Sequence, residues 1–127
     1  MEYRILIVDD SSIVRKSLLK TLGMANFPIK NVREAEDGQK ALECLRAEES
    51  DIIFLDINMP VMNGIEFLQA LQKEQLMKGA AVIVISTEGS KLRAEELQHL
   101  GIRAQLRKPI RPEILNSTIG TIFGERI

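Results

Sequence analysis

Short apolar runs alternate with longer amphipathic stretches along the whole chain, and this alternation constrains the fold more than any other feature. Three runs rich in Ile and Val are nearly continuous: Tyr3 to Val8, Asp51 to Leu55 and Ala81 to Ile85. Runs of this length and composition predict strands that are buried on both faces of a parallel sheet. Two weaker runs, Lys30 to Ala35 and Arg103 to Arg107, fit a second and a fifth strand.

The stretches between these runs predict five helices. Their apolar residues at helical spacing are Ile13, Val14, Leu18 and Leu22; Ala41, Leu42 and Leu45; Ile65, Leu68, Leu71 and Leu76; Leu92, Leu97 and Leu100; and Ile114, Leu115, Thr118, Ile119 and Ile122. Ser11 or Ser12 can cap the first helix, and Pro112 suits the first turn of the last one. Five strands that alternate with five helices predict an α/β fold, a parallel sheet with helices on both faces.

Composition limits the protein to a few classes. The 127 residues suit one domain, and their content of 45% hydrophobic and 28% charged residues is ordinary for a globular protein. The net charge of −1 gives no basic surface for direct contact with nucleic acid. No apolar run approaches the roughly 20 residues of a membrane span. Chain length and the lack of a spanning run therefore predict one domain over residues 1–127 that is not inserted in a membrane. The single Cys44 cannot form an internal disulfide, which suits a cytoplasmic protein.

The residues best suited to chemistry stand where the predicted strands end. They are Asp9 and Asp10 after the first strand, Asp56 and Asn58 after the third, Ser86 and Thr87 after the fourth, and Lys108 after the fifth. Each one alone is more simply explained as part of a turn or a helix cap. Open parallel sheets, however, bind ligands beyond the carboxyl ends of their strands, so we expect the site at this edge.

Three carboxylates at one edge repel each other, which raises the pKa of at least one unless a cation compensates. Mg²⁺ prefers oxygen ligands and typically binds one or two carboxylates together with a phosphate. A carboxylate beside such a cation can accept a phosphoryl group as a nucleophile. Lys108 could neutralise a second phosphoryl oxygen, and a hydroxyl of Ser86 or Thr87 could donate to a third.

Other chemistries have little support. His99, the only histidine, is predicted late in the fourth helix, far in sequence from Cys44. A Ser-His-Asp triad or a thiolate zinc site is therefore not indicated. The chain also lacks the glycine-rich loops that bind nucleotide phosphates.

At the residues that end the strands, the sequence resembles the response-regulator receiver family, and most closely its single-domain chemotaxis-type members. The resemblance runs from about Arg4 to Phe123. The segments that carry it are Ile5 to Asp10, Ala35 to Gly38, Leu55 to Gly64, Ile83 to Ser86, and Lys108-Pro109. It implies a flavodoxin-like fold with the strand order 2-1-3-4-5, which is that of the chemotaxis receiver.

The resemblance also implies a role for each site residue. Asp56 is similar to the phosphoacceptor. Asp9 and Asp10 are similar to the acidic pair that holds Mg²⁺, and Asn58 would add its backbone carbonyl to the metal.

The remaining implied roles concern the ends of the last two strands. Ser86 is similar to the switch hydroxyl, whereas Thr87 is one position too late. Lys108 is similar to the phosphate-binding lysine, and Lys108-Pro109 to the family's cis peptide. Gln105 departs from the pattern, because many members carry an aromatic residue at that position.

The function implied is that of a phosphorylated switch. Asp56 would take the phosphoryl group from a phosphohistidine on a sensor histidine kinase or a phosphotransfer protein. The face of the fourth helix, fifth strand and fifth helix would then bind an output protein. Such a chain catalyses only its own phosphorylation and dephosphorylation. One alternative is a docking module that phosphorylation does not switch. The other is a Mg²⁺-dependent phosphatase that acts through Asp56. Such a phosphatase would carry a second acidic residue two positions after Asp56, where this chain has Asn58.

Overall fold

The computed structural model describes residues 2–86 and 94–124, which form five strands and five helices in strict alternation. The strands are β1 (Tyr3–Val8), β2 (Ile29–Ala35), β3 (Ile52–Leu55), β4 (Ala81–Ser86) and β5 (Ala104–Arg107). The helices are α1 (Ser12–Leu22), α2 (Gly38–Ala47), α3 (Gly64–Lys73), α4 (Ala94–His99) and α5 (Pro112–Phe123). The predicted α/β alternation is confirmed.

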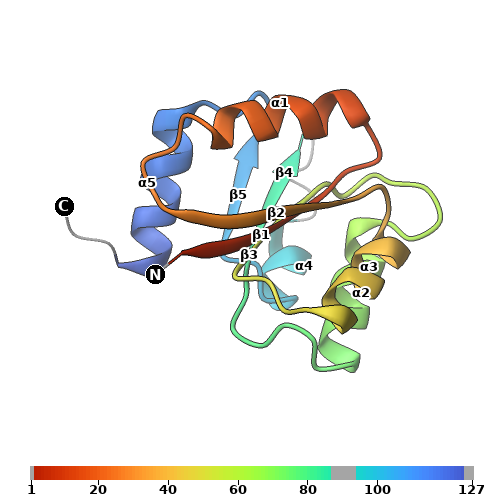
Figure 1. The fold of residues 1–127 in the computed structure, drawn as a ribbon. Coiled ribbons are helices and arrows are strands. Elements are labelled where there is room, and N and C mark those ends of the chain that lie inside the picture. Colours follow the sequence, from red (N-terminus) through yellow and green to blue (C-terminus); the bar gives the residue numbers. More distant parts are fainter. Residues whose placement is uncertain (1, 87–93, 125–127) are drawn as a thin grey trace.

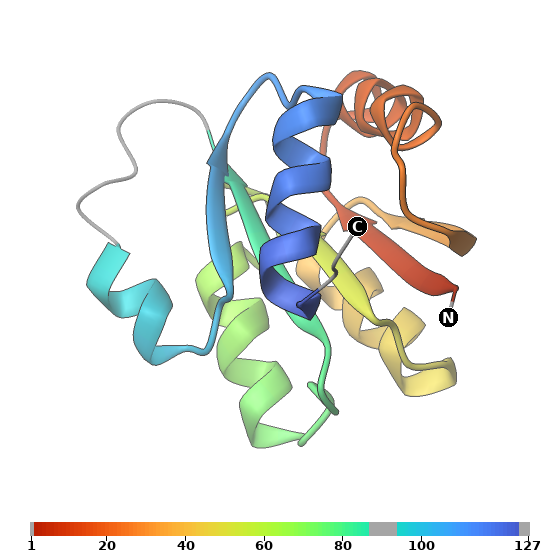
Figure 2. The same ribbon diagram turned by 90° about the vertical axis from the view of Figure 1, so that its left-hand side faces the viewer.

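All five strands are parallel and lie in the order β2-β1-β3-β4-β5, as expected. The order reverses at β1, which pairs with β2 on one side and with β3 on the other. Helices cover both faces of the sheet: α1 and α5 lie on one face, and α2, α3 and α4 on the other (Figures 1 and 2). None of the described helices is long and apolar enough to cross a membrane.

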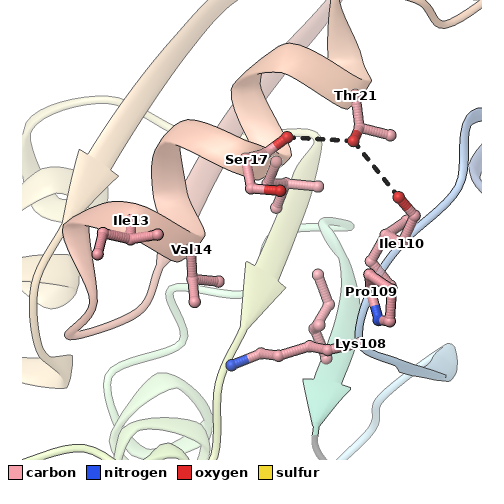
Figure 3. Close-up of a pocket in the computed structure, with 9 residues that line it drawn as sticks. Ile13, Val14, Ser17, Thr21, Lys108, Pro109 and Ile110 are labelled. Atoms are coloured by element: carbon pink, nitrogen blue, oxygen red, sulfur yellow. Dashed lines mark hydrogen bonds between the residues drawn. The ribbon is translucent and has the colours of Figure 1, made fainter.

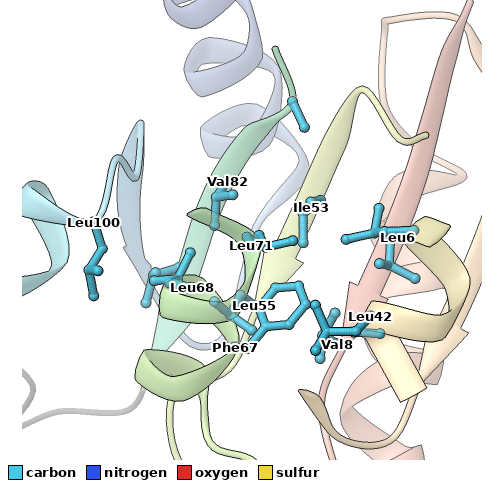
Figure 4. Close-up of a cluster of buried hydrophobic side chains, with 14 of the residues drawn as sticks. Leu6, Val8, Leu42, Ile53, Leu55, Phe67, Leu68, Leu71, Val82 and Leu100 are labelled. Atoms are coloured by element: carbon cyan, nitrogen blue, oxygen red, sulfur yellow. The ribbon is translucent and has the colours of Figure 1, made fainter. Parts of the chain in front are cut away.

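Two apolar cores hold these layers together, one on each face of the sheet. Alternate residues of each strand point to opposite faces, so Leu6 and Val8 join one core while Ile5 and Ile7 join the other. Figure 4 shows the first core, where Phe67, Leu68 and Leu71 of α3 pack against the sheet beside Leu42 of α2. The central strands β3 and β4 are buried along their whole length. This burial fixes where their carboxyl ends emerge.

Polar side chains start the helices that follow β1, β2 and β3. The Ser11 hydroxyl accepts from the Val14 N–H, which decides between the two predicted caps of α1. The Asp37 carboxylate accepts from the Lys40 N–H at the start of α2. Asn63 begins α3 with a reciprocal capping box. These caps satisfy backbone N–H groups at the start of each of these helices.

The predicted third helix extended too far, because Leu76 lies beyond the end of α3 at Lys73. Gln75 adopts a left-handed backbone conformation, with a φ of 56°. The Leu76 N–H donates to the Leu71 carbonyl and the Gln75 N–H to the Gln72 carbonyl, which is the Schellman arrangement of a helix end. Leu76 still packs against the core, which explains its apolar character.

The described part of the fourth helix ends at His99, one residue before Leu100, the last residue of its predicted apolar pattern. Leu97 is buried within it, and Leu100 is buried immediately after it. Leu92 lies outside the described residues. His99 is the last residue of α4, in agreement with its predicted place late in this helix.

Candidate functional site

The pairing of β1, β3 and β4 brings the candidate residues to one edge. Val8 lies opposite Leu55, and Leu55 opposite Val84. The Asp56 N–H then donates to the Val8 carbonyl at 2.9 Å, so Asp9 and Asp56 leave the sheet side by side.

Asp9, Asp10 and Asp56 form an acidic cluster in which one oxygen of each lies within 4.8 Å of the others. Two ligands of an octahedral Mg²⁺, with bonds of about 2.1 Å, lie about 3.0 to 4.2 Å apart. A small inward movement would therefore let the cluster hold such an ion. Asp9 is only 4% exposed, whereas Asp10 is exposed and open to solvent waters. The donor set fits a hard divalent cation that keeps part of its hydration shell.

Lys108 reaches this cluster from the end of β5. Its Nζ lies 3.1 Å from Asp9 Oδ2 and 3.8 Å from Asp56 Oδ1. The Lys108 N–H donates to the Ser86 carbonyl at 2.9 Å, which continues the pairing of β4 and β5. The Lys108-Pro109 peptide is cis, as predicted. A phosphoryl group on Asp56 would therefore lie close to the ammonium group of Lys108.

The environment raises the pKa of Asp56 above its ordinary value. Burial of the carboxyl group is the main cause, and the negative charge of Asp9 adds to it. The positive charge of Lys108 and a hydrogen bond from the Ile57 N–H oppose the rise. The expected repulsion among the carboxylates therefore acts on Asp56, and a bound cation would relieve it.

Ser86 and Asn58 are the other two predicted site residues. Ser86 ends β4 and is 7% exposed, next to the strand that delivers Asp56. Asn58 is exposed in the loop between β3 and α3. Thr87, the other candidate hydroxyl, lies outside the described residues.

Two close glycine contacts fix the loop that carries Asn58. The Gly64 N–H donates to the Ile57 carbonyl, and a Cβ at Gly64 would lie 2.7 Å from the Asp56 carbonyl oxygen. The Gly38 N–H donates to the Met62 carbonyl, where a Cβ would also collide. The family segments that end in Gly38 and Gly64 are therefore parts of one packed unit around Asp56.

A groove of about 340 Å³ opens beside the site, between α1 and the segment after β5. Its walls come from Val14, Ser17 and Thr21 on one side and from Pro109 and Ile110 on the other (Figure 3). The Thr21 hydroxyl donates to the Ser17 and Ile110 carbonyls and so links the two walls.

Arg15 is a site residue that the sequence interpretation missed. Its Nη1 donates to the Asp9 carbonyl at 2.7 Å, and its Nε to Glu34 Oε1 of β2 at 2.9 Å. The only signal in the sequence was a basic residue one turn into the helix that follows Asp9-Asp10. Basic residues are common on helix surfaces, so this signal does not identify a site residue.

The predicted output face includes β5, an edge strand next to β4. Gln105 is exposed there and is paired with Val84. Its side chain therefore lies at the surface in this structure.

Comparisons with known proteins agree on one family. A model described as the response regulator receiver domain matches residues 5–120. The chain is 35% identical over 127 residues to the chemotaxis protein CheY of Pseudomonas aeruginosa, with 98% of each chain covered. It is 31% identical over 122 residues to the chemotaxis protein CheY1 of Helicobacter pylori, with 95% of this chain and 97% of that protein covered. The solved structure of the chemotaxis protein CheY4 of Vibrio cholerae has a TM-score of 0.82 at 33% identity, covering 96% of this chain and 99% of that one.

Proposed function

Because this chain belongs to the response regulator receiver domain family of two-component systems, we propose that it accepts a phosphoryl group on Asp56 with the help of Mg²⁺. The observation that supports this function best is the convergence of Asp9, Asp10, Asp56 and Lys108 at one edge of the sheet. Receiver domains are switch proteins rather than classical enzymes. Residues 1–127 would form one such domain.

Asp9, Asp10, Asp56 and the backbone carbonyl of Asn58 would hold the metal. When bound, Mg²⁺ neutralises charge on the acidic cluster and on the phosphoryl oxygens. A carboxylate oxygen of Asp56 attacks phosphorus as the P–N bond of a phosphohistidine breaks, and the leaving imidazole takes a proton. Lys108 stabilises one phosphoryl oxygen through its ammonium group, and Ser86 donates its hydroxyl to another.

The phosphohistidine would come from a sensor histidine kinase or a phosphotransfer protein in the cytoplasm. His99 does not serve as this donor, because it ends α4 and a receiver takes its phosphoryl group from a partner. An output protein would bind the face of α4, β5 and α5.

Mass spectrometry after incubation with acetyl phosphate and Mg²⁺ tests the proposed function. We expect a single labile phosphoryl adduct in the wild type and none in Asp56→Asn. The absence of an adduct on a folded wild type would favour a docking module that phosphorylation does not switch. Steady release of phosphate from many phosphomonoesters would favour a phosphatase.

A further inference from the structure

We propose that Arg15 is a positioning residue that sets the affinity of the acidic cluster for Mg²⁺ by holding the backbone carbonyl of Asp9. The inference rests on the proposed function, because it concerns the metal of that same site. It differs from the family roles described above, in which Arg15 has no part.

Asp9 is held by hydrogen bonds at all four of its polar positions. Its N–H donates to the Ala35 carbonyl at 3.1 Å, and its Oδ1 accepts from the Ser11 N–H at 2.9 Å. Its Oδ2 accepts from Lys108 Nζ at 3.1 Å, and its carbonyl accepts from Arg15 Nη1 at 2.7 Å. The contact with Arg15 is the only one of the four that reaches the peptide between Asp9 and Asp10.

The direction of Asp10 depends on that peptide. Within the described part of the chain, the Asp10 side chain makes no hydrogen bond or ion pair of its own. The orientation of the Asp9 carbonyl therefore helps to set the direction of the Asp10 Cα–Cβ bond, from which the Asp10 carboxylate extends toward the cluster. A preorganised pair of metal ligands binds a metal more tightly than a pair that must first be ordered.

Arg15 is suited to this task because it is itself held in place. Its side chain is 16% exposed, and its Nε donates to Glu34 Oε1 at the end of β2. The guanidinium group therefore bridges the strand next to β1 and the acidic turn after β1. A guanidinium presents several donors in a rigid plane, so it can make both contacts at once, which the single ammonium of a lysine does less well.

Replacement of Arg15 would change the Mg²⁺ affinity in opposite directions through its charge and through its hydrogen bond. Removal of a positive charge near three carboxylates, taken alone, would tighten Mg²⁺ binding by Coulomb attraction. Loss of the hydrogen bond to the Asp9 carbonyl would weaken it. The sign of the change therefore separates a positioning role from a simple electrostatic one.

The experiment measures the Mg²⁺ dissociation constant by NMR titration at about 0.15 M salt, following the backbone amides of residues 9–11. We expect Arg15→Met to raise this constant about tenfold, as is usual when a residue that supports metal ligands is lost. Arg15→Lys should give a smaller rise, because the charge stays but the planar fork is lost. Lys16→Met is the matched control, since it removes an exposed charge at the next position of the same helix.

Thermal unfolding without Mg²⁺ shows whether each variant folds. An unfolded Arg15→Met would leave the test to Arg15→Lys, measured against the wild type. An unchanged or lower dissociation constant in the folded Arg15 variant would overturn the inference.

Acetyl phosphate labelling of the wild type separates this inference from the proposed function. A wild type that binds Mg²⁺ but takes no phosphoryl group would contradict the function and leave the Arg15 comparison valid. A wild type that binds no Mg²⁺ would contradict both.

Discussion

The ammonium group of Lys108 lies 3.1 Å from Asp9 and 3.8 Å from Asp56, so one cation from the end of β5 contacts two carboxylates from β1 and β3. All three side chains are largely buried, at 20% exposure or less. The ion pairs hold together a cluster that would otherwise repel itself. Lys108 pairs with Asp9 and Asp56, two of the three carboxylates in the acidic cluster, so we expect it to compete with a divalent cation for them.

We predict that Lys108→Met destabilises the protein and at the same time tightens Mg²⁺ binding. The free energy of unfolding should fall by about 2 kcal/mol, because two buried carboxylates lose their partner. Mg²⁺ affinity should rise about fivefold, which corresponds to about 1 kcal/mol of relieved competition. Phosphorylation by acetyl phosphate should nevertheless become slower, because the ammonium no longer stabilises the phosphoryl oxygens. Denaturant unfolding, NMR titration and timed mass spectrometry measure the three effects.

Lys16→Met removes an exposed lysine charge and serves as the control for these measurements. It should change each of them little, because solvent and salt screen exposed charges. A Lys108→Met variant that binds Mg²⁺ more weakly than the wild type would contradict the competition between lysine and metal.

We predict that Asp56→Asn stabilises the protein at pH 7 in the absence of Mg²⁺. The pKa of Asp56 is raised from its ordinary value of 3.8 by burial and by Asp9. The folded state therefore binds a proton more readily than the unfolded state, and ionisation of Asp56 lowers stability as pH rises through the folded pKa. The amide substitution removes this cost, so a gain of about 1 kcal/mol at pH 7 should shrink toward zero below pH 3.8. Urea unfolding across this pH range measures it.

Asp51→Asn is the matched substitution, and its effect on stability at pH 7 should have the opposite sign to that of Asp56→Asn. Arg4 hydrogen bonds to the Asp51 carboxylate and lowers its pKa below 3.8. Stability from this pair is present above the unfolded pKa and is lost as pH falls through the folded one. Asp51→Asn should therefore destabilise the protein at pH 7, with a loss that diminishes in acid. The assignment of the two pKa shifts fails if both variants change stability in the same direction.

We predict that Gly64→Ala destabilises the protein and impairs phosphorylation, whereas Gly120→Ala stabilises it. A Cβ at Gly64 would lie 2.7 Å from the Asp56 carbonyl oxygen and 2.8 Å from the Ile57 Cα, so the backbone at the phosphoacceptor must shift. A cost of about 2 kcal/mol is usual for such overpacking. A Cβ at Gly120, inside α5, meets nothing within 4 Å, so the helix gains about 0.8 kcal/mol.

Denaturant unfolding and acetyl phosphate labelling of both glycine variants provide the measurement. Equal phosphorylation rates in Gly64→Ala and the wild type would mean that the packing of this loop does not support the reactivity of Asp56.

Periodicity was sufficient to predict the five strands and most of the helices, whereas the order of the strands was implied by the family resemblance. Observed strand ends lie within one residue of the predicted ones. For β1, β3 and β4, burial on both faces leaves a clear signal in the sequence. The end of α3 could not be predicted, since the left-handed turn at Gln75 occurs at a residue type that rarely adopts it. Leu76 kept the apolar pattern because it packs on the core beyond the helix.

The site was predictable in composition but not in all of its contacts. The positions of Asp9, Asp56 and Lys108 follow from strand ends that meet at one edge. The preference of Lys108 for Asp9 over Asp56, however, depends on side-chain geometry that spacing does not encode. Arg15 was missed for the same reason, because its hydrogen bond goes to a backbone carbonyl and no residue type marks such an acceptor.

The last prediction concerns Gln105, which is exposed on the edge strand β5. Many members of the family carry an aromatic residue at this position. On activation, movement of the Ser86 hydroxyl toward the phosphoryl group would vacate space for such a ring. Burial of a glutamine would gain less apolar contact and would require hydrogen-bond partners. We therefore expect the coupling between phosphorylation and the output face to lie near the low end of the usual range of about 1–3 kcal/mol.

Gln105→Tyr should strengthen this coupling. The measurement compares the affinity for the output partner with and without Mg²⁺ and beryllofluoride, which mimics the phosphoryl group on Asp56. It is made in the wild type and in Gln105→Tyr. Gln98→Tyr, at an exposed position of α4, is the matched control for simply adding an aromatic ring to the same face. The gap left by Ser86 should favour the ring only at position 105, so only Gln105→Tyr should show a larger change on activation. An equal change in the wild type and Gln105→Tyr would mean that Gln105 is solvated surface with no part in the switch.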